Sequence, residues 1–529
     1  MTDGRLDLRN RDALFDALEA APFDVAVIGG GITGAGVARD AAMRGLKVAL
    51  VEARDFASGT SSRSSKMIHG GLRYLPMGDL GLVREAASER KIVQAIAPHL
   101  ARETPFVIPA KTAATIAKLR AGLWTFEKLG GVPRSRKHEV WSQSQLRERE
   151  PAVLADDLAG AVVYPEYLTD DARLTLANIR AATAHGALAV NYASAASFVI
   201  EGGRAVGIAV VDTLRGEGRR ARLTAHLIVN AAGPWVDAVR ALECPGAEPR
   251  LKLTKGVHLV VSRERLPVDR TIILPAADKR SVFAVPKGEA TYIGTTDTFY
   301  PAADLWPTIT AGDADYLLDA AAQRFSSSRL THADITSAWS GVRPLVGEEG
   351  KSASEISRKD ELWTGPAGVL AIAGGKLTAY RKMAQRVVDQ IEETLGRKVS
   401  PCRTDKEPLP GGDVEVDAVV AALAALQVPH LAAHRLVGLY GSETEIVMAD
   451  GGDVAAEARH AVGAEGALTL EDYWIRRSAR AWFDPDGGTA ALADAAGAMA
   501  PLLGWSPEEA ERQIVACRSI HDGAMAAFQ

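Results

Sequence analysis

The stretch FDVAVIGGGITGAGVARDAAMRGLKVALVE, residues 23–52, decides the fold of this 529-residue chain. Its first apolar run, Val25–Ile28, is typical of a buried parallel strand. A glycine-rich turn with the spacing G-x-G-x-x-G and a helical stretch follow, and a second apolar run leads into Glu52. The three spaced glycines are Gly29, Gly31 and Gly34. The stretch therefore predicts a Rossmann-like βαβ unit at the start of an α/β fold.

The same glycines predict a dinucleotide ligand. They let backbone N–H groups approach a pyrophosphate at the positive end of a helix. Glu52 lies close to the spacing of about 20 residues at which an acid binds a ribose hydroxyl. The alternative is a glycine-rich turn without a ligand, but the strand, helix, second strand and acid together favour a bound nucleotide.

The polar stretch ASGTSSRSSKMIHGGLRYL, residues 57–75, favours FAD over NAD. A nicotinamide enzyme would continue the alternating βα pattern here. We expect the serines to cap the next helix and to donate to pyrophosphate or flavin, His69 to contact the flavin, and Gly70 and Gly71 to bring the backbone close to a flat ring. No role is assigned to Arg63. The serines concerned are Ser61, Ser62, Ser64 and Ser65.

Two later stretches fit the same cofactor. The apolar strand 227–229 ends in NAAGPW, where Gly233 permits close passage over a ligand. A second strand, 369–373, runs into a glycine pair and a helix whose positive end would stabilise the negative charge of a reduced flavin. Lys376 would add a full charge there, unless it is an ordinary solvated lysine. The residues of this second turn are Gly374, Gly375, Lys376, Leu377 and Thr378.

Composition narrows the possible classes of protein. The net charge of −5 gives no indication of nucleic-acid binding. The three cysteines are scattered without a CxxC pair, so no metal site is expected and a reducing compartment fits best. The first twenty residues lack the apolar run of a signal peptide, and no window has the roughly 18 apolar residues of a membrane span. We therefore expect a cytoplasmic protein whose membrane contact, if it has one, is peripheral.

Residues 251–297 contain short strands separated by Pro, Gly and charged turns, which predicts an antiparallel sheet. Such a sheet could form a platform over a flavin. The expected division is an oxidoreductase domain at 20–405 and a C-terminal helical domain at 406–529. Within the first domain, FAD-binding segments at about 20–90, 160–250 and 335–400 would enclose an inserted substrate sheet at about 251–334.

These stretches resemble the FAD-dependent aerobic glycerol-3-phosphate dehydrogenases, and they occur in that family's order over residues 23 to about 400. The stretches are VIGGGITGAGVARDAAMRGLKVALVE, TSSRSSKMIHGGLRYL, YLTDDARLTLAN, VNAAGPWV, KGVHLVV, IGTTDT, SGVRPL and GGKLTAYRKMA. The resemblance implies a fold like that of glycine and D-amino-acid oxidases with a helical C-terminal cap. It also implies oxidation of sn-glycerol 3-phosphate to dihydroxyacetone phosphate, with electrons passing through FAD to a membrane quinone, and a homodimer.

The family's active-site motifs fall on five positions of this chain: Arg73, Tyr74, His258, Arg343 and Lys376. A phosphate dianion in a partly dry pocket needs more than one fixed cation. Arg343 is expected to bind the phosphate, although a structural salt bridge is its alternative role and Asp297 is a candidate partner. Two histidines, His69 and His258, are candidates for the general base that removes the hydroxyl proton, because histidine titrates near neutral pH, and His258 is our hypothesis. Its alternative is a buried core histidine.

Residues 111–137 contain seven Lys or Arg and one acid, Glu127, interleaved with Ile, Leu, Trp and Phe. This composition is typical of a helix that lies on anionic lipid, and equally of a surface helix with a solvated basic face. Three other functions stay open. They are a glycerol-3-phosphate oxidase that uses oxygen, an amine oxidase of the glycine-oxidase type, and a flavoprotein without turnover.

Overall fold

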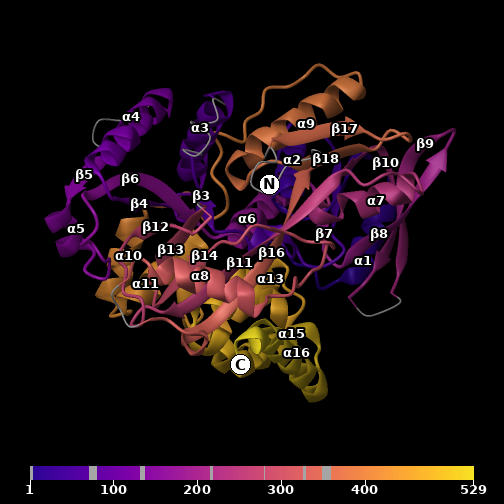
Figure 1. Ribbon diagram of the computed structural model, residues 1–529. Coiled ribbons are helices and arrows are strands. Elements are labelled where there is room, and N and C mark those ends of the chain that lie inside the picture. The colour runs from indigo at the N-terminus through magenta and orange to yellow at the C-terminus, as the bar shows by residue number, and fades with distance from the viewer. Residues whose placement is uncertain are drawn as a thin grey trace.

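Two β-sheets and a group of C-terminal helices make up the computed structural model (Figure 1). It describes residues 4–70, 80–130, 137–214, 218–278, 280–325, 329–347 and 359–529. The predicted combination of a Rossmann-like domain, an antiparallel-sheet domain and a C-terminal helical region is confirmed.

The first sheet carries the βαβ unit. Strands β7, β2, β1, β10 and β18 lie side by side and parallel, β17 pairs antiparallel with β18, and the hairpin β8–β9 extends from β10. The described strands of this sheet are β1 (Phe23–Ile28), β2 (Val48–Val51), β7 (Leu188–Val190), β8 (Ala193–Glu201), β9 (Arg204–Asp212), β10 (Arg220–Asn230), β17 (Asp360–Thr364) and β18 (Leu370–Gly374).

Strand β1 is buried on both faces, which explains its continuous apolar run. Val25 and Val27 pack with one cluster that includes helices α2, α6 and α9, whereas Ala26 and Ile28 pack with a cluster around Phe15 of α1. Helix α7 follows β10. These helices are α1 (Arg11–Glu19), α2 (Ile32–Met43), α6 (Asp171–Ala184), α7 (Val236–Glu243) and α9 (Tyr380–Thr394).

The second sheet contains the predicted antiparallel strands of residues 251–297 and extends beyond them. Its path is β15-β11-β14-β13-β12-β4-β6-β3, with β16 pairing to β11 and β5 to β6. The described strands are β3 (Met67–Ile68), β4 (Ala101–Ala110), β5 (Glu139–Ser142), β6 (Gly160–Thr169), β11 (Leu251–Ser262), β12 (Thr271–Pro275), β13 (Ser281–Lys287), β14 (Ala290–Gly294), β15 (Thr298–Phe299) and β16 (Ile335–Val346).

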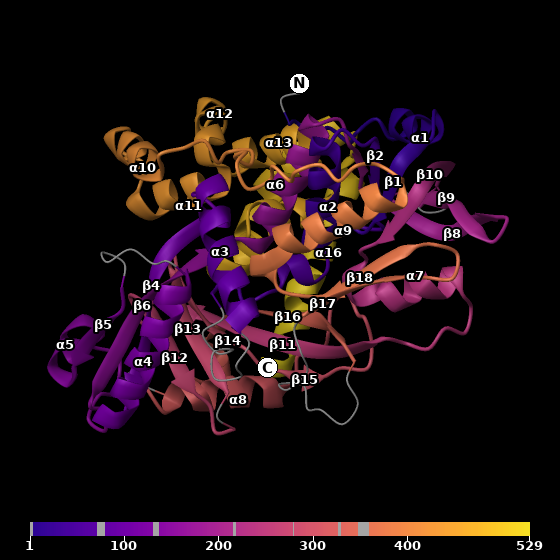
Figure 2. The ribbon, with the colours of Figure 1, turned by 90° about the horizontal axis from the view of Figure 1, so that it is seen from above.

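Alternation along β11 separates the two faces of this sheet. Val257, Leu259 and Val261 pack with helix α8, whereas Val260 packs with the C-terminal helices. The remaining described α-helices before residue 400 lie on the outer part of this sheet or between the two sheets (Figure 2). They are α3 (Leu80–Ile96), α4 (Ala113–Gly130), α5 (Gln143–Arg149) and α8 (Ala311–Ala322).

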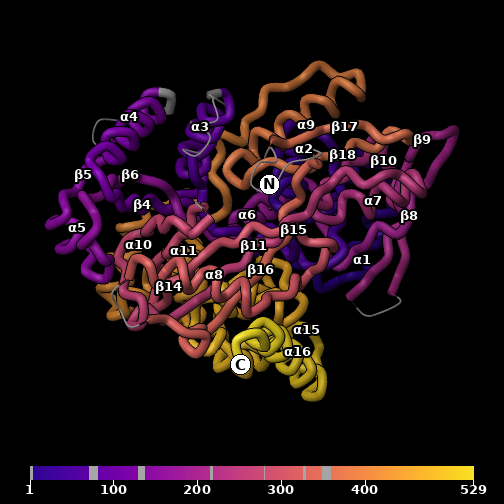
Figure 3. The backbone as a smooth tube through the Cα atoms, viewed as in Figure 1, coloured from indigo at the N-terminus to yellow at the C-terminus, as the bar shows by residue number. Residues whose placement is uncertain are grey.

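The C-terminal helices form one side of the molecule, and α15 and α16 lie at the bottom of the view beside the C-terminus (Figure 3). They include a π-helix, η8 (Asp472–Arg477), which reaches the first sheet through a buried ion pair described below. The α-helices are α10 (Val416–Ala425), α11 (His430–Tyr440), α12 (Thr444–Ala449), α13 (Val454–Glu465), α14 (Arg480–Phe483), α15 (Leu492–Leu503) and α16 (Pro507–Met525). In the described part of the chain, no helix combines the length and the apolar character needed to cross a bilayer.

Candidate active site

Most of the predicted cofactor residues lie along one edge of the first sheet. Because β1, β2, β10 and β18 are parallel, their carboxyl ends meet at this edge. Ile28 lies in register with Val51 and with Asn230. The glycine turn, Glu52, the segment around Gly233 and the Gly374–Gly375 pair are therefore brought together from four separate parts of the sequence. Strand β2 lies on one side of β1 and strand β10 lies on the other. Open parallel sheets bind ligands at the carboxyl ends of strands at such a point.

The β1–α2 turn has the conformation that the glycines predict. Gly29 has φ of +108°, and a Cβ there would lie 2.6 Å from the carbonyl oxygen of Ala231. A Cβ on Gly34 would collide with the carbonyl of Gly29, so helix α2 packs directly against the turn. Gly31 is the N-cap of α2, and the first turn of this helix carries no acidic side chain. The helix end is thus suited to an anion.

Glu52 orders the same turn. One carboxylate oxygen accepts from the Gly30 N–H at 2.7 Å, and the other accepts from the Arg54 N–H at 2.9 Å. Burial raises the pKa of Glu52 even though these two hydrogen bonds favour its charged form. The carboxylate therefore lies at the end of β2 beside the glycine turn, in the position from which such an acid binds a ribose.

The loop that carries Ser61, Ser62, Ser64 and Ser65, here called the serine loop, contacts both sheets. Among the described residues, its serines do not cap the next helix as the sequence had led us to expect. The serine side chains form their hydrogen bonds with other groups. Ser61 Oγ accepts from the Ile32 N–H at 3.0 Å and so caps the preceding helix α2. Ser62 Oγ donates to the Gly59 carbonyl at 3.4 Å, and Ser64 Oγ accepts from the Lys66 N–H at 2.9 Å. Ser65 Oγ lies 2.9 Å from His258 Nε2. The expectation was wrong because residues 60–62 themselves form a 3₁₀ turn, η1 (Thr60–Ser62), folded back on α2.

Two buried acids that sequence reasoning missed hold this loop. Asp171, at the start of α6, accepts from the Lys66 ammonium at 2.6 Å and from the Ser64 N–H at 2.9 Å. Glu166 accepts from the Gly70 N–H at 3.1 Å and pairs with a buried arginine, Arg90, at 2.7 Å. Lys66 has φ of +54°, so its backbone is held in the left-handed region. The only local signal was the acidic pair in YLTDD, which the start of a helix also explains.

The second glycine turn meets the serine loop. Gly374 ends β18, and Lys376 is the N-cap of the short 3₁₀ helix η6 (Leu377–Ala379) that precedes α9. Thr378 is buried, and its Oγ1 lies 3.2 Å from both the amide nitrogen and the carbonyl oxygen of His69. Gly233 opens another 3₁₀ helix, η4 (Gly233–Trp235), at the end of β10. The loops that the sequence predicted to surround one cofactor are therefore neighbours.

His258 lies in the middle of β11 on the face that carries Val260, and its side chain is almost wholly buried. Its ring stacks on Trp339, with 4.7 Å between the ring centroids and 12° between the planes. Burial, and then the positive charges of Arg343 and Lys66, hold the pKa of His258 well below 6.5. The imidazole is therefore neutral at physiological pH and able to accept a proton.

Arg343, on β16, forms the ion pair that the sequence offered as its alternative role. Its Nη1 lies 3.3 Å from Asp297 Oδ1, and its Nη2 donates to Thr295 Oγ1 at 3.0 Å. The side chain of Arg343 is still 18% exposed, and its charge is one of those that lower the pKa of His258. The structure thus brings this guanidinium and the imidazole into one neighbourhood.

Three residues of the predicted site, Gly71, Arg73 and Tyr74, lie outside the described residues. Arg63, to which no role was assigned from the sequence, stacks on the Trp306 ring at 3.8 Å from its centroid and donates to the Leu305 carbonyl. Burial lowers the pKa of Arg63 to about 9. Arg63 therefore fixes the serine loop to the segment before α8.

A second missed cluster joins this region to the C-terminal helices. Asp55, which follows β2, is fully buried and pairs with both Arg477 and Arg476 of η8, the latter at 2.5 Å. Although burial raises the pKa of Asp55, the two arginines hold it below its usual value. Arg476 also binds Asp472 at 2.7 Å. No sequence signal could have linked residues more than 400 positions apart.

A partly buried cluster of two acids and a histidine resembles a metal site without needing a metal. The ligand atoms of Glu443, His460 and Glu465 lie within 4.8 Å of one another. However, Arg173 pairs with Glu465 and Arg180 with Glu443, each at 2.6 Å. The two guanidinium groups already balance the two carboxylates, so a divalent cation would add uncompensated charge.

The residues at the sheet edge fit FAD. Helix α2 begins at a bare glycine turn without an acidic first turn, Glu52 lies at the end of β2, and the serine loop closes over the helix start through Ser61. On the other side, His258 Nδ1 is a buried atom without a hydrogen-bond partner among the described residues. The nucleotide edge and the polar side chains around His258 thus adjoin, an arrangement that suits a flavin that accepts hydride.

Fold and site together define an FAD-dependent oxidoreductase. Residues 24–381 match the family described as FAD dependent oxidoreductase, and residues 402–510 match the C-terminal domain of alpha-glycerophosphate oxidase. The aerobic glycerol-3-phosphate dehydrogenases of Staphylococcus aureus strains USA300 and COL are each 38% identical over 516 residues, covering 92% of both chains. The protein belongs to this glycerol-3-phosphate dehydrogenase family.

Comparison with solved structures supports the same family and fold. The glycerol-3-phosphate dehydrogenase from Bacillus halodurans, complexed with FAD, is 34% identical and superimposes with a TM-score of 0.82, covering 98% of this chain and 99% of that one. Glycine oxidase from Geobacillus kaustophilus has a TM-score of 0.54 at 22% identity, with 73% of this chain and 98% of that one covered. At that identity the second likeness describes the fold alone.

Proposed function

We propose that this protein oxidises sn-glycerol 3-phosphate to dihydroxyacetone phosphate with FAD as the hydride acceptor. The observation that carries the proposal is the neighbourhood of a neutral, buried imidazole and a partly exposed guanidinium beside the FAD edge. Family membership gives the substrate: the curated relatives are named aerobic glycerol-3-phosphate dehydrogenases.

His258 acts as the general base that takes the proton of the C2 hydroxyl. It is suited to this role because its lowered pKa keeps the imidazole neutral at the pH of the cytoplasm. Arg343 and Lys376, with Arg73 and Tyr74 from outside the described residues, bind and orient the phosphate. Arg343 would bind it while still held by Asp297, since a guanidinium has five donors and the carboxylate uses one face of it.

The residues that would hold FAD are those of the sheet edge and its loops. The glycine turn and the start of α2 take the pyrophosphate, and Glu52 takes a ribose hydroxyl. The serine loop and the turn before η6 line the flavin, which when bound supplies the hydride acceptor. The residues of these two loops are Ser61, Ser62, Ser64, Ser65, His69, Gly70, Gly71, Gly233, Gly374, Gly375, Lys376, Leu377 and Thr378.

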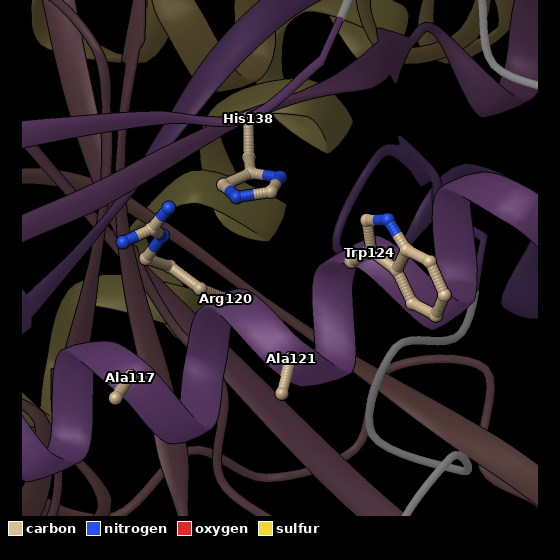
Figure 4. Close-up of a pocket in the computed structure, with 5 residues that line it drawn as sticks. All are labelled: Ala117, Arg120, Ala121, Trp124 and His138. Carbon is tan, nitrogen blue, oxygen red and sulfur yellow. The ribbon is translucent and has the colours of Figure 1, made fainter.

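Electrons then pass to a membrane quinone, and helix α4 is the proposed contact with the cytoplasmic face of the membrane. A pocket of about 290 Å³ lies beside this helix and is lined by Arg120, Trp124 and His138, among others. Figure 4 shows these side chains. Trp124 is 51% exposed, whereas Leu123 and Phe126 are buried in the protein. The face that is free to meet lipid is therefore basic with a single aromatic side chain, which favours electrostatic attachment over insertion. A homodimer is the expected assembly.

Anaerobic addition of glycerol 3-phosphate to the FAD-loaded protein tests the reaction. We expect the visible absorbance of the oxidised flavin to bleach in proportion to the substrate added. Unchanged absorbance would refute the proposal. A second candidate is an oxidase that passes electrons to oxygen, favoured by the match of residues 402–510 to a glycerophosphate-oxidase domain. Stoichiometric hydrogen peroxide in air would support the oxidase, and rapid turnover with a quinone but little peroxide would support the dehydrogenase.

A further inference from the structure

The imidazole of His258 is anchored at one nitrogen and open at the other. Its Nε2 lies 2.9 Å from Ser65 Oγ, and its ring is stacked on the indole of Trp339. Nδ1 is buried and has no hydrogen-bond partner in the described part of the chain. The ring therefore has a fixed plane, a fixed rotation and one nitrogen left for another molecule.

Ser65 is itself held by the side chains that surround the imidazole. Trp339 is the register partner of His258 in the β11–β16 pair, and its Nε1 donates to the Ser64 carbonyl at 3.2 Å. The hydroxyl of Tyr292, on β14, donates to the Ser65 carbonyl at 3.0 Å. The same two aromatic residues also contact each other, with ring centroids 5.4 Å apart. The sheet thus positions both His258 and the loop that supplies its partner.

The hydrogen-bond inventory distinguishes the two neutral tautomers of His258. With the proton on Nδ1, a buried N–H would have no acceptor, and Ser65 would donate to Nε2. With the proton on Nε2, that N–H donates to Ser65 Oγ, and only a lone pair is left unpaired. Buried donors without partners are rarer in folded proteins than incompletely satisfied acceptors. The Nε2–H tautomer is therefore favoured, and it leaves the lone pair on Nδ1.

We infer that Ser65 and Trp339 are positioning residues that hold His258 in the Nε2–H tautomer, so that Nδ1 is the atom that receives the hydroxyl proton of the substrate. The inference rests on the proposed oxidation of a secondary alcohol. In that step the hydroxyl O–H bond gives its proton to Nδ1, the C2–H bond gives its hydride to the bound flavin, and the C2–O bond becomes a carbonyl. The Nε2–H bond to Ser65 strengthens when the ring becomes charged, so Ser65 stabilises the imidazolium that forms.

Replacing Ser65 by alanine tests the positioning role. We expect the rate of flavin reduction by glycerol 3-phosphate to fall about 10²-fold, as for other losses of catalytic orientation. The acid limb of its pH profile should move to lower pH, because the protonated ring loses an acceptor. Ser65→Thr keeps a hydroxyl and should restore both properties. Ser337→Ala, which removes a buried hydroxyl that donates to the Ala481 carbonyl at 2.8 Å, should change neither. A Ser65→Ala protein with the wild-type rate and an unmoved acid limb would overturn the inference.

The tautomer of His258 can be measured in the oxidised protein without any catalytic reaction. In the oxidised FAD-bound protein labelled with ¹⁵N-histidine, the signals that disappear in His258→Gln belong to this ring. We expect a protonated Nε2 and an unprotonated Nδ1, and the opposite assignment would overturn the inference. This measurement stands even if glycerol 3-phosphate fails to reduce the flavin, a result that would refute the proposed function instead.

Discussion

The ammonium of Lys66 lies 2.6 Å from Asp171 Oδ1, and both side chains are buried. The other oxygen of Asp171 accepts from the Ser64 N–H, so one carboxylate neutralises the lysine and holds the serine loop. Burial raises the pKa of Asp171 although Lys66 opposes the shift. A buried pair of this kind costs most when only one partner is removed.

Asp171→Asn is therefore expected to destabilise the protein by about 3–5 kcal/mol, because it leaves the Lys66 charge buried without a counter-ion. It should also release FAD at lower urea concentrations than the wild type does, since the serine loop loses its anchor. Urea unfolding followed by tryptophan and flavin fluorescence measures both effects. Asp170→Asn is the matched control, because asparagine preserves the cap that Asp170 gives to the Arg173 N–H. Equal stability of the two variants would contradict the assignment.

Asp55→Asn should cost a similar amount, about 3–5 kcal/mol, because Arg476 and Arg477 would lose the buried carboxylate that they share. Chemical unfolding measures the change. Arg512→Ala is the comparison, since Arg512 is 68% exposed in its pair with Glu509 and exposed pairs contribute about 0–1 kcal/mol. A loss for Asp55→Asn no larger than that of Arg512→Ala would show that this cluster does not hold the two parts together.

Arg343→Gln separates phosphate binding from a purely structural ion pair. If the guanidinium binds the phosphate, its loss removes a charged hydrogen bond of about 1.5–3 kcal/mol, and the KM for glycerol 3-phosphate rises about 10- to 100-fold. Asp297→Asn removes the same intramolecular pair and leaves the cation in place. We expect that variant to keep the KM within a few-fold of the wild type. Equal effects of both substitutions on KM and stability would assign Arg343 a structural role.

The buried histidine His99 should make the unfolding free energy of the protein fall as the pH is lowered. Burial, together with Arg173 and Arg180, lowers the pKa of His99 to about 3. Between that value and the unfolded value of about 6.5, the unfolded chain binds a proton that the folded chain does not, so stability falls as the pH is lowered. His99→Asn should flatten the dependence of the unfolding free energy on pH by up to about 1.4 kcal/mol per pH unit in this window. A His99→Asn protein whose unfolding free energy keeps the wild-type dependence on pH would contradict this assignment.

Reversal of charge on helix α4 tests the membrane contact. Lys118→Glu together with Arg120→Glu should abolish flotation with vesicles that contain anionic lipid at low salt, because each basic residue near such a surface contributes about 1 kcal/mol. Arg518→Glu, an exposed position on α16, should float as the wild type does. Wild-type protein that stays at the bottom of the gradient would refute the proposed attachment.

The parts of the fold that sequence could predict are those with a local pattern. The run Val25–Ile28, the glycine turn and Glu52 follow one another directly, and each lies where the pattern indicates. The strands of residues 251–297 were likewise predicted, since alternation and turn residues are local signals. The roles of the serines were predicted less well. Ser61 caps the preceding helix and Ser65 contacts a strand 193 residues away, and only the tertiary fold decides such partners.

In the candidate site, too, sequence predicted residues that a local motif marks and missed partners that only the tertiary fold decides. His258 and Arg343 were proposed from short motifs and the resemblance, and the structure brings them into one neighbourhood. Trp339 was not proposed, because a tryptophan in a strand has no feature that marks it as a stacking partner. No site role was predicted for Asp171 from the sequence. Its pairing with Lys66 spans 105 positions, and that pairing depends on how α6 packs beside the loop.

The ion pairs of Asp55 also impose an order on biosynthesis. Arg476 and Arg477 are added to the nascent chain 421 and 422 residues after Asp55. Until the ribosome has passed them, the turn after β2 carries an acid with no buried counter-charge, although every strand of the first sheet has already emerged or been made. The nucleotide edge therefore reaches its final form only after η8 has been synthesised, and fragments that stop before η8 leave it unfinished.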